Sequence, residues 1–426
     1  MKIKVSCKSY DEVCGINIGN HEKPVRQSAF FRHLIRFLSR GEMKAVNFEY
    51  TASGMEKLGK DEPCLILMNH SSFTDLQIIG TLFYRRQYHI VCTNDGLIGK
   101  SGLMRRIGCI PTKKFISDPT LVRDMKYTFD TLKSSIVMYP EASYSFDGAE
   151  TPLPGSLAKC LKLMKVPVIM VKTTGAFLRD PLYNCLQKRK TDVKAEVKYL
   201  LSPEDIADKS VDELQKILKD EFRYDHFKDQ YQRGIRINEP FRADGLHRVL
   251  YKCPACGCEG RMEGKGIDIV CKGCNKAYTL LENGKLKAAD DRTEFEFVTD
   301  WYAWERQKVR DELEAGDYLL DSDVDIKILA DMKSMYSVGE GRLRHTKDGF
   351  ELTGCEGKLN YHQSGKASYS LYADYFWYEI GDMICIGDNT RQYYCFPKDQ
   401  KHAIVAKARL AAEEIYKMNM NKNATH

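Results

Sequence analysis

Short apolar runs alternate with helix-like segments through the first half of the chain. The runs have the length of buried strands, and between them apolar residues recur every three or four positions, as on one face of a helix. The predicted strands are residues 64–67, 88–92, 136–139, 166–172 and 193–201, and the predicted helices are residues 75–83, 121–132, 156–164 and 211–222. Ser210 is a suitable N-cap for the last of these helices. Strands that alternate with helices predict an α/β fold, with a sheet flanked by helices.

The pattern changes to a β-rich one after about residue 320. Strands are predicted at residues 325–329, 341–344, 349–354, 367–372, 383–386 and 392–396. Polar turns at residues 347–349 and 386–389 favour hairpins. A helix is predicted at residues 401–417, with residues 418–426 as a frayed tail. Many short strands followed by one helix resemble a pleckstrin-homology-like domain, which is barrel-like and has a C-terminal helix.

Composition narrows the class of protein. The chain has 426 residues, of which 43% are hydrophobic and 29% are charged, as in a folded globular protein. Its formal net charge of +6, from 65 basic and 59 acidic residues, fits an anionic surface or substrate without establishing either. No apolar run reaches the roughly 20 residues that a membrane-spanning helix needs, and the N-terminus lacks the apolar core of a signal peptide. We therefore expect a cytoplasmic protein.

Residues 26–40 have the pattern of an amphipathic helix. The apolar side is large and aromatic, and the polar side carries arginines. The apolar residues are Phe30, Phe31, Leu34, Ile35, Phe37 and Leu38, and the arginines are Arg26, Arg32, Arg36 and Arg40. This pattern is typical of a helix that lies at the surface of an anionic membrane. The alternative is a helix that packs against the rest of the protein, and the two can hold together.

Two Cys-x-x-Cys pairs lie close together near the middle of the chain. They are Cys253 with Cys256 and Cys271 with Cys274, separated by 14 residues. Such pairs present four thiolates to one tetrahedral zinc ion, so the segment resembles a zinc ribbon with a structural zinc. Cys258 is not expected to be a ligand, and a redox pair is the weaker alternative. The ribbon is small and mildly basic, and no nucleic-acid binding is predicted.

A histidine and an aspartate follow the first predicted strand, in the run Asn69-His70-Ser71-Ser72-Phe73-Thr74-Asp75. The end of a strand is a suitable place for His70 to project, and Asp75 can reach back to its imidazole. The aspartate would fix the tautomer and stabilise the imidazolium. The spacing therefore favours His70 as a general base that Asp75 orients. The alternative is a buried core histidine beside a helix-capping aspartate.

This run is the first of four blocks that resemble the 1-acylglycerol-3-phosphate acyltransferase family. Asn69, His70 and Asp75 match its first block, Asn-His, four residues and Asp. Residues 108–114 match the second, Gly-x-x-Phe-Ile-x-Arg, only loosely, with Lys114 in the place of the arginine. The third block, Pro-Glu-Gly-Thr-Arg, reads Pro140-Glu141-Ala142-Ser143-Tyr144, and the fourth, Val-Pro-Val-Ile-Pro, reads Val166-Pro167-Val168-Ile169-Met170. The blocks keep their order over residues 63–177, and the resemblance extends to about residue 225.

The departures from the family concern the acceptor. In the family, the arginine of the third block is associated with the phosphate of the acceptor, and Tyr144 carries no permanent charge to replace it. Lys113 and Lys114 either bind a phosphate as point charges or form a solvated basic turn. Glu141 is an acceptor ligand or a structural carboxylate. The substrate-binding residues that the resemblance implies are Asn69, Lys113, Lys114, Glu141 and Ser143.

The resemblance implies acyl transfer from a thioester, either acyl-coenzyme A or an acyl-carrier protein, to a lysophospholipid such as lysophosphatidate. In this reaction of phospholipid biosynthesis, His70 would deprotonate the acceptor hydroxyl. Two alternatives stay open: an acyltransferase for a non-phosphorylated lipid acceptor, and a non-catalytic membrane adaptor with a decayed acyltransferase domain. The expected partners are an anionic membrane surface, the acceptor lipid and an acyl carrier protein, with peripheral membrane association.

Together the patterns divide the chain into four regions. An acyltransferase domain with an N-terminal amphipathic helix is predicted at residues 1–248, and a zinc ribbon at residues 249–290. A helical linker at residues 291–322 contains a predicted surface helix at residues 305–313. The pleckstrin-homology-like β domain with its C-terminal helix takes residues 323–426.

Overall fold

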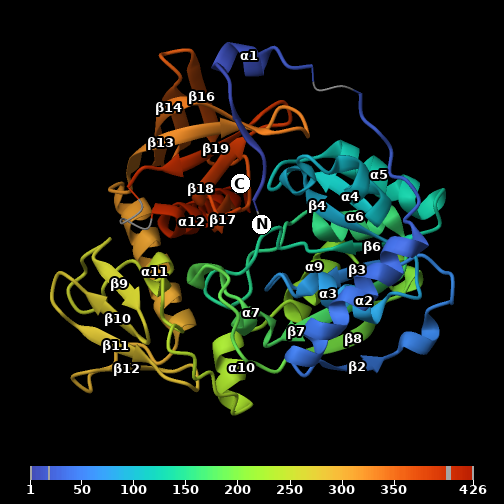
Figure 1. The fold of residues 1–426 in the computed structure, drawn as a ribbon, viewed down its shortest axis with the longest axis horizontal. Helices are drawn as coiled ribbons and strands as arrows, with labels where there is room; N and C mark the ends of the chain where they lie inside the picture. Colours follow the sequence, from blue (N-terminus) through green and yellow to red (C-terminus); the bar gives the residue numbers. More distant parts are fainter. Residues whose placement is uncertain (1, 18–19, 400–403, 425–426) are drawn as a thin grey trace.

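The structure is a computed structural model that describes residues 2–17, 20–399 and 404–424. These residues form three sheets with helices around them (Figure 1). The fold is mixed α/β, as predicted, and its C-terminal region is rich in strands.

The first sheet is the framework of the N-terminal region. Its strands have the order β2-β8-β7-β3-β6-β4-β5. The bounds are β2 Glu49–Ser53, β3 Leu65–Met68, β4 Tyr88–Thr93, β5 Cys109–Thr112, β6 Ser135–Met138, β7 Val168–Thr174 and β8 Lys194–Leu201. From β7 to β5 the neighbouring strands are parallel, and β8 runs antiparallel to β7. The carboxyl ends of the parallel strands therefore meet at one edge of the sheet.

Helices cover both faces of this sheet. The helices of this part of the chain are α2 Ala29–Ala45, α3 Asp75–Leu82, α4 Ser101–Ile107, α5 Pro119–Asp130, α6 Leu157–Met164, α7 Ala176–Arg179, α8 Pro203–Asp208, α9 Val211–Glu221 and α10 His226–Gln232. Ser210 caps α9 as predicted, because its Oγ accepts from Glu213 N at 3.2 Å. A Cβ on Gly80 of α3 would lie 2.5 Å from Ile35 Cγ2 of α2, so the close approach of these helices requires glycine. Every strand and helix that the apolar pattern predicts here is present, with small shifts of its ends.

The second sheet is small and antiparallel, with the order β12-β11-β10-β9. Its strands are β9 Met262–Lys265, β10 Asp268–Cys271, β11 Ala277–Leu280 and β12 Leu286–Ala288, and α11 Val298–Ala315 follows them. Trp301 of α11 is buried, and its Nε1 donates to Lys252 O at 2.9 Å. The helix predicted at residues 305–313 is present, but it is longer than predicted and does not lie wholly at the surface. The helix begins earlier and buries one face, including Glu305 and Val309.

The third sheet contains the C-terminal strands, in the order β16-β15-β14-β13-β19-β18-β17. The bounds are β13 Leu320–Ile328, β14 Met335–Thr346, β15 Gly349–Gly354, β16 Leu359–Ser364, β17 Tyr372–Trp377, β18 Gly381–Gly387 and β19 Gln392–Pro397. The predicted turns at residues 347–349 and 386–389 join β14 to β15 and β18 to β19. Strand β1, Val5–Cys7, pairs in parallel with β14, and the short α1, Tyr10–Cys14, follows it. The start of the chain therefore joins the C-terminal sheet, although the predicted boundaries place it with residues 1–248 (Figure 1).

Three predictions for this region differ from the structure. The predicted strand at residues 367–372 is wrong, because Ser368 Oγ donates to Ser370 O at 2.6 Å and holds a loop that ends where β17 begins. Strand β16 escaped prediction because its sequence is mostly polar. Helix α12, Ile404–Ala424, continues through most of the predicted frayed tail. Residues 401–403 of the predicted helix and residues 425–426 of the tail lie outside the described residues.

Candidate active site

The candidate active site lies at the carboxyl edge of the first sheet. His70 follows β3, which is the central strand, and the segment with Tyr139 and Glu141 follows β6. Lys113 and Lys114 follow β5. Parallel strands bring these segments to one edge, which is where open α/β sheets bind their ligands. The order of the strands thus places the first three sequence blocks at the same edge of the sheet.

His70 and Asp75 form the predicted dyad. His70 Nδ1 lies 2.9 Å from Asp75 Oδ2, and the His70 side chain is 16% exposed. The same carboxylate oxygen accepts from the backbone N–H of Ser71 at 2.9 Å and of Ser72 at 3.3 Å. Because Asp75 Oδ2 accepts hydrogen bonds from both N–H groups, we assign it as the acceptor of the bond to the imidazole as well. The imidazole proton then lies on Nδ1. Nε2 has no hydrogen-bond partner among the described residues, so its lone pair is free.

The surroundings keep the imidazole neutral. Burial, and secondly the positive charge of Lys114, lower the pKa of His70 well below its ordinary value. Burial also raises the pKa of the Asp75 carboxyl above its usual range, and the N–H donors of Ser71 and Ser72 act against this rise. A neutral imidazole is the form that a general base needs. The pair can therefore accept a proton at Nε2 and place the resulting imidazolium beside a carboxylate.

Two tyrosine rings pack against the imidazole. The ring centroid of Tyr139 lies 4.3 Å from that of His70, and the centroid of Tyr144 lies 4.0 Å from it. The Phe73 ring packs in turn on Tyr144, at 5.4 Å. These rings cover most of the His70 side chain and account for its burial. Sequence reasoning noted only that Tyr144 lacks the charge of the family arginine, and it missed this contact.

The polar side-chain atoms of Asn69 form hydrogen bonds within the protein. Its Oδ1 accepts from Thr173 N at 2.7 Å, and its Nδ2 donates to Thr173 O at 3.0 Å and to Ser71 Oγ at 3.1 Å. The side chain is fully buried. Asn69 thus ties the His70 loop to β7, and its contact with the acceptor stays a prediction. Ser143 is also buried, and its Oγ donates to the neighbouring carbonyl of Tyr144.

The Glu141 carboxylate connects three segments of the chain through hydrogen bonds. Its Oε2 accepts from His70 N at 2.8 Å, and its Oε1 accepts from Thr151 N at 2.9 Å and from the Tyr224 hydroxyl at 2.8 Å. Burial raises the pKa of Glu141 to about 7, and these donors oppose the rise. Because both carboxylate oxygens are occupied, the structure favours the structural alternative for Glu141 over acceptor binding.

The two lysines after β5 have different environments. Lys113 donates to the backbone carbonyl of Asn389, in the turn between β18 and β19. The Lys114 ammonium lies 4.2 Å from the ring centroid of Tyr372 and has no hydrogen-bond acceptor among the described residues. Burial lowers the pKa of Lys114, while the charges of Asp95 and Asp374 act against this. Of the predicted acceptor residues, Lys114 keeps its charge available.

The third sheet and α12 contribute contacts that sequence reasoning missed. Tyr372 of β17 donates to Asp95 Oδ2 at 2.5 Å, and Tyr369 donates to Pro140 O at 3.3 Å. Arg409 of α12 donates to Tyr144 O at 3.2 Å. The only local signal in the sequence was a charged pair, Arg409 and Glu413, within an alanine-rich helix.

The four predicted zinc ligands converge beside the second sheet. Their Sγ atoms all lie within 4.8 Å of one another, with 3.8 Å between Cys253 and Cys274 and 3.7 Å between Cys256 and Cys271. Zinc–sulfur bonds of about 2.3 Å in a tetrahedron place the sulfurs about 3.8 Å apart, so the donor set fits zinc. Cys258 is exposed and lies outside the cluster. The cluster can hold a metal, and zinc stays a prediction.

Comparisons with known proteins match part of this chain. Residues 49–173 match the family model described as Acyltransferase. The solved structure of the 1-acyl-sn-glycerophosphate (LPA) acyltransferase PlsC from Thermotoga maritima is similar to 45% of this chain and 80% of its own, with 16% identity and a TM-score of 0.34. A search of curated proteins finds no match. The matched region contains the His70–Asp75 dyad together with Lys114, Glu141 and Tyr144.

Proposed function

We propose that this chain transfers a fatty acyl group from an acyl thioester to the hydroxyl of a lysophospholipid, as a step of phospholipid biosynthesis. The acyltransferase family that residues 49–173 match supports the reaction class. The observation that carries the proposal is the free Nε2 of His70, whose Nδ1 is held by Asp75 at 2.9 Å. The donor is acyl-coenzyme A or an acyl-carrier protein, and the acceptor is lysophosphatidate-like.

The dyad supplies the proton transfers that the reaction needs. Nε2 of His70 takes the proton of the acceptor hydroxyl while its oxygen attacks the thioester carbonyl, forming the new C–O bond. Asp75 stabilises the imidazolium. As the intermediate collapses, the C–S bond breaks and the imidazolium returns the proton to the leaving thiolate. Ester and thiol are formed, and His70 is neutral again.

Lys114 is the residue that we assign to the acceptor phosphate. Its ammonium faces the site, lowers the pKa of His70 and has no carboxylate partner within ion-pair distance among the described residues. A compact ammonium binds phosphate as a point charge. One observation favours a second candidate, a non-phosphorylated lipid acceptor: Tyr144 stands where the family has its phosphate-associated arginine.

The proposal is tested by acceptor-dependent thiol release. The protein is incubated on liposomes with long-chain acyl-coenzyme A or acylated carrier protein, with and without lysophosphatidate, and the free thiol is measured. We expect release that depends on the acceptor. A parallel set of lyso-lipids without phosphate separates the two acceptor classes. If no combination of donor and acceptor gives thiol release, the result would favour the non-catalytic adaptor.

Replacing Lys114 by methionine should raise KM for a phosphate-bearing acceptor by about tenfold or more, because a hydrogen bond to a charged group is lost. Since Lys114 is not the base, kcat should change little. The measurement is initial rate against acceptor concentration. Lys113→Met is the matched control, because Lys113 already donates to Asn389 O. An unchanged KM in Lys114→Met would move the acceptor assignment to non-phosphorylated lipids.

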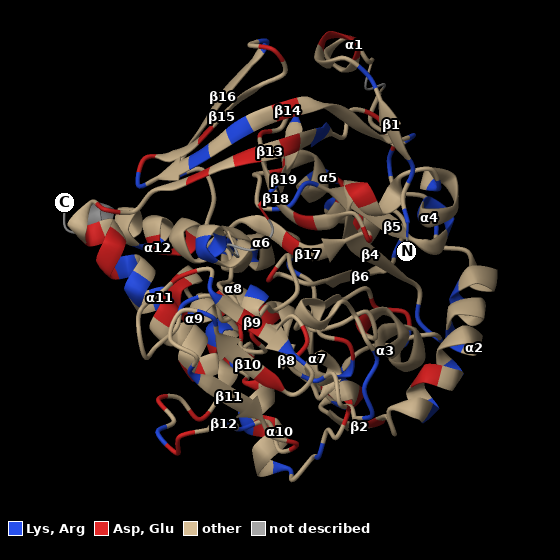
Figure 2. Cartoon of the chain, turned by 60° about the vertical axis from the view of Figure 1, so that its left-hand side comes forward, with Lys and Arg blue, Asp and Glu red and all other residues tan. Residues whose placement is uncertain are grey.

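Helix α2 supports the proposal of a membrane surface. Phe30, Phe37 and Leu38 are 69%, 62% and 66% exposed, while Ile35 packs on α3. Figure 2 shows bands of Lys and Arg along α2 at the outer edge of the molecule. Arg32 and Arg36, which the pattern places on the polar side, bond to Tyr84 O and Thr81 Oγ1, which supports the packing alternative for part of this helix.

We propose that α2 and the start of α3 lie in an anionic membrane interface. Phe73 and Leu76 of this part of the chain are also exposed. Leu76 lies one helical turn before Gly80 and therefore on the side of α3 that meets α2. Phe73 packs on Tyr144, which packs on His70, so an apolar path leads from this surface to the base. Within the described residues, no helix has both the length and the apolar character to cross a bilayer.

Replacing Phe30 and Phe37 together by serine should weaken binding to anionic vesicles by at least about tenfold, because each phenylalanine contributes roughly 2 kcal/mol when buried in lipid. The measurement is co-sedimentation with vesicles of graded anionic lipid content. Leu319→Ser is the control, since Leu319 is similarly exposed and lies beside the third sheet. Equal binding of wild type and the double variant would contradict the assignment of α2.

A further inference from the structure

The loop that carries the third sequence block is held from outside the matched region. This loop, residues 140–146, follows β6 and places Tyr144 against His70. Ala142 in it has a φ of 58°, a left-handed conformation that costs a non-glycine residue about 1 kcal/mol. The loop therefore does not hold its shape by local preference alone.

A cavity borders the end of the loop. A cavity of about 150 Å³ lies between residues 146–151, α11 and α12. Phe146, the last residue of the loop, lines this cavity together with Arg409 and Glu413 of α12. Contacts from this side therefore add to the restraint that the hydrogen bonds of Glu141 supply.

Arg409 supplies the most direct restraint. Its side chain is 3% exposed, its Nη1 donates to Tyr144 O at 3.2 Å, and its guanidinium lies 4.2 Å from the ring centroid of Phe146. One side chain of α12 thus contacts two positions of the loop. A planar guanidinium can donate in one direction and stack in another, which a lysine cannot do.

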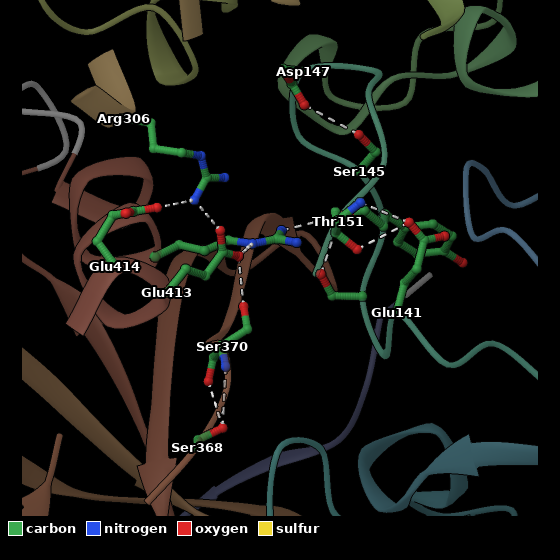
Figure 3. Close-up of polar contacts among 12 residues, drawn as sticks. Glu141, Ser145, Asp147, Thr151, Arg306, Ser368, Ser370, Glu413 and Glu414 are labelled. Atoms are coloured by element: carbon green, nitrogen blue, oxygen red, sulfur yellow. Dashed lines mark hydrogen bonds and ion pairs between the residues drawn. The ribbon is translucent and has the colours of Figure 1, made fainter. Parts of the chain in front are cut away.

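The guanidinium is itself fixed by a buried network, shown in Figure 3. Arg409 Nε lies 3.2 Å from Glu413 Oε1, and Ser370 Oγ donates to the same oxygen at 2.7 Å. Arg306 of α11 lies 2.6 Å from Glu413 Oε2. Two helices and the loop before β17 therefore converge on one carboxylate, which holds Arg409 in a single orientation.

Two further contacts restrain the same loop from the C-terminal region. Tyr369 donates to Pro140 O at 3.3 Å, and the ring centroid of Tyr375 lies 4.4 Å from that of Phe146. Pro140, Tyr144 and Phe146 are thus all held by residues beyond residue 360. The contacts span the length of the loop, from its start to its end.

We propose that Arg409 is a positioning residue of the active site, and that it holds the loop so that Tyr144 stays packed on His70. The C-terminal helix then completes the site rather than serving only as an adaptor. Arg409 does not touch the reacting atoms and acts through Tyr144. The inference deepens the proposed acyl transfer and rests on it for its kinetic consequences, while the packing of His70 can be measured independently.

The proposal has a consequence for proton uptake. If the loop loosens, water reaches the imidazole and the pKa of His70 rises toward its ordinary value of about 6.5. Because the base must be neutral, the acid limb of kcat/KM then moves to higher pH. The charged and titratable groups that face His70 or its tyrosine neighbours are Asp75, Tyr88, Lys114, Tyr139, Glu141, Tyr144, Asp180, Asp374 and Tyr378. The substitution leaves all of these in place.

The test compares Arg409→Ala, Arg409→Lys and Arg310→Ala in the full chain. Arg310 also joins α11 to α12, at 3.3 Å from Glu414, but does not contact the loop. The readouts are the pH profile of kcat/KM and the titration of the His70 ring by NMR, assigned with His70→Gln. We expect Arg409→Ala to lower kcat by about 10- to 100-fold, as misplaced catalytic groups do, and to raise the His70 titration midpoint. Arg310→Ala should match wild type.

Arg409→Lys separates position from charge. It keeps the positive charge, so a raised His70 midpoint in this variant comes from the loop and not from a lost charge. It also decides the question if Arg409→Ala does not fold. A His70 midpoint equal to wild type in both Arg409 variants would overturn the proposal. If wild type transfers no acyl group, the proposed function fails, and the NMR titration still decides whether Arg409 positions the loop.

Discussion

Replacing His70 by alanine is expected to lower the rate of acyl transfer by a factor of about 100 to 10,000, because the acceptor hydroxyl loses its base. Among the described residues around His70, neither Glu141 nor Asp75 can take over this role. Glu141 uses both carboxylate oxygens in bonds to the protein, and Asp75 lies behind the imidazole. The measurement is kcat from thiol release at saturating donor and acceptor. His362→Ala is a suitable control, since His362 is exposed on β16.

The same experiment separates an enzyme from an adaptor. In a decayed site, His70 would have no need of a free Nε2 or of an aspartate at 2.9 Å from Nδ1. Equal thiol release in wild type and His70→Ala would contradict the assigned base. The acid limb of the wild-type profile should lie below the ordinary histidine value of about 6.5, because burial lowers the pKa of His70.

Replacing Cys271 by serine is expected to remove a bound zinc and to destabilise the region around the second sheet. In zinc-finger peptides the apparent binding free energy of such sites is about 10 to 16 kcal/mol, and binding is coupled to folding. Here Cys271 ends β10 and is buried, so the loss reaches the sheet itself. The measurements are zinc content by elemental analysis and the midpoint of thermal unfolding, which we expect to fall by about 10 °C or more.

The structure offers a matched control for the zinc prediction. Cys258 lies in the same segment but is exposed and outside the cluster, so Cys258→Ser should keep both the metal and the thermal midpoint. A wild-type protein without stoichiometric zinc would contradict the assignment. So would a Cys271→Ser variant as stable as Cys258→Ser.

The sequence predicts the first sheet well for a physical reason. Its strands β3, β6 and β7 are buried on both faces and read as continuous apolar runs, such as Leu65–Met68. The dyad was predictable because His70 and Asp75 lie only five residues apart, across a strand end and a helix start. The cluster of four cysteines was predictable because each pair lies within one tight turn. All of these features are local in the chain.

The features that sequence reasoning missed are contacts between distant segments. Tyr144 packs on His70, and Arg409 reaches Tyr144 from a helix near the other end of the chain. Neither the hydrophobic periodicity nor the spacing of motifs indicates which distant residues are in contact. The opposite roles of Lys113 and Lys114 likewise depend on strands of the third sheet, since Asn389 accepts from the first and Tyr372 lies against the second.

At helix α11 and at the loop before β17, the sequence pattern indicates a structure that differs from the one observed. Charged residues along α11 suggested a surface helix, but Glu305 is buried and its Oε1 accepts from Lys252 N at 2.7 Å. Alternating serine and tyrosine at residues 368–372 suggested a strand. The serine hydroxyls instead bond to a backbone carbonyl and to Glu413, which favours a loop.

The most direct test of the account follows the acyl group itself. A carbon-13-labelled long-chain acyl-coenzyme A is incubated with lysophosphatidate liposomes and wild type or His70→Ala, and the lipids are analysed by mass spectrometry. The account predicts a labelled diacyl product that forms with wild type and falls at least about 100-fold with His70→Ala. Product that forms equally with both proteins would contradict the role of His70, and label that appears only as free fatty acid would contradict acyl transfer.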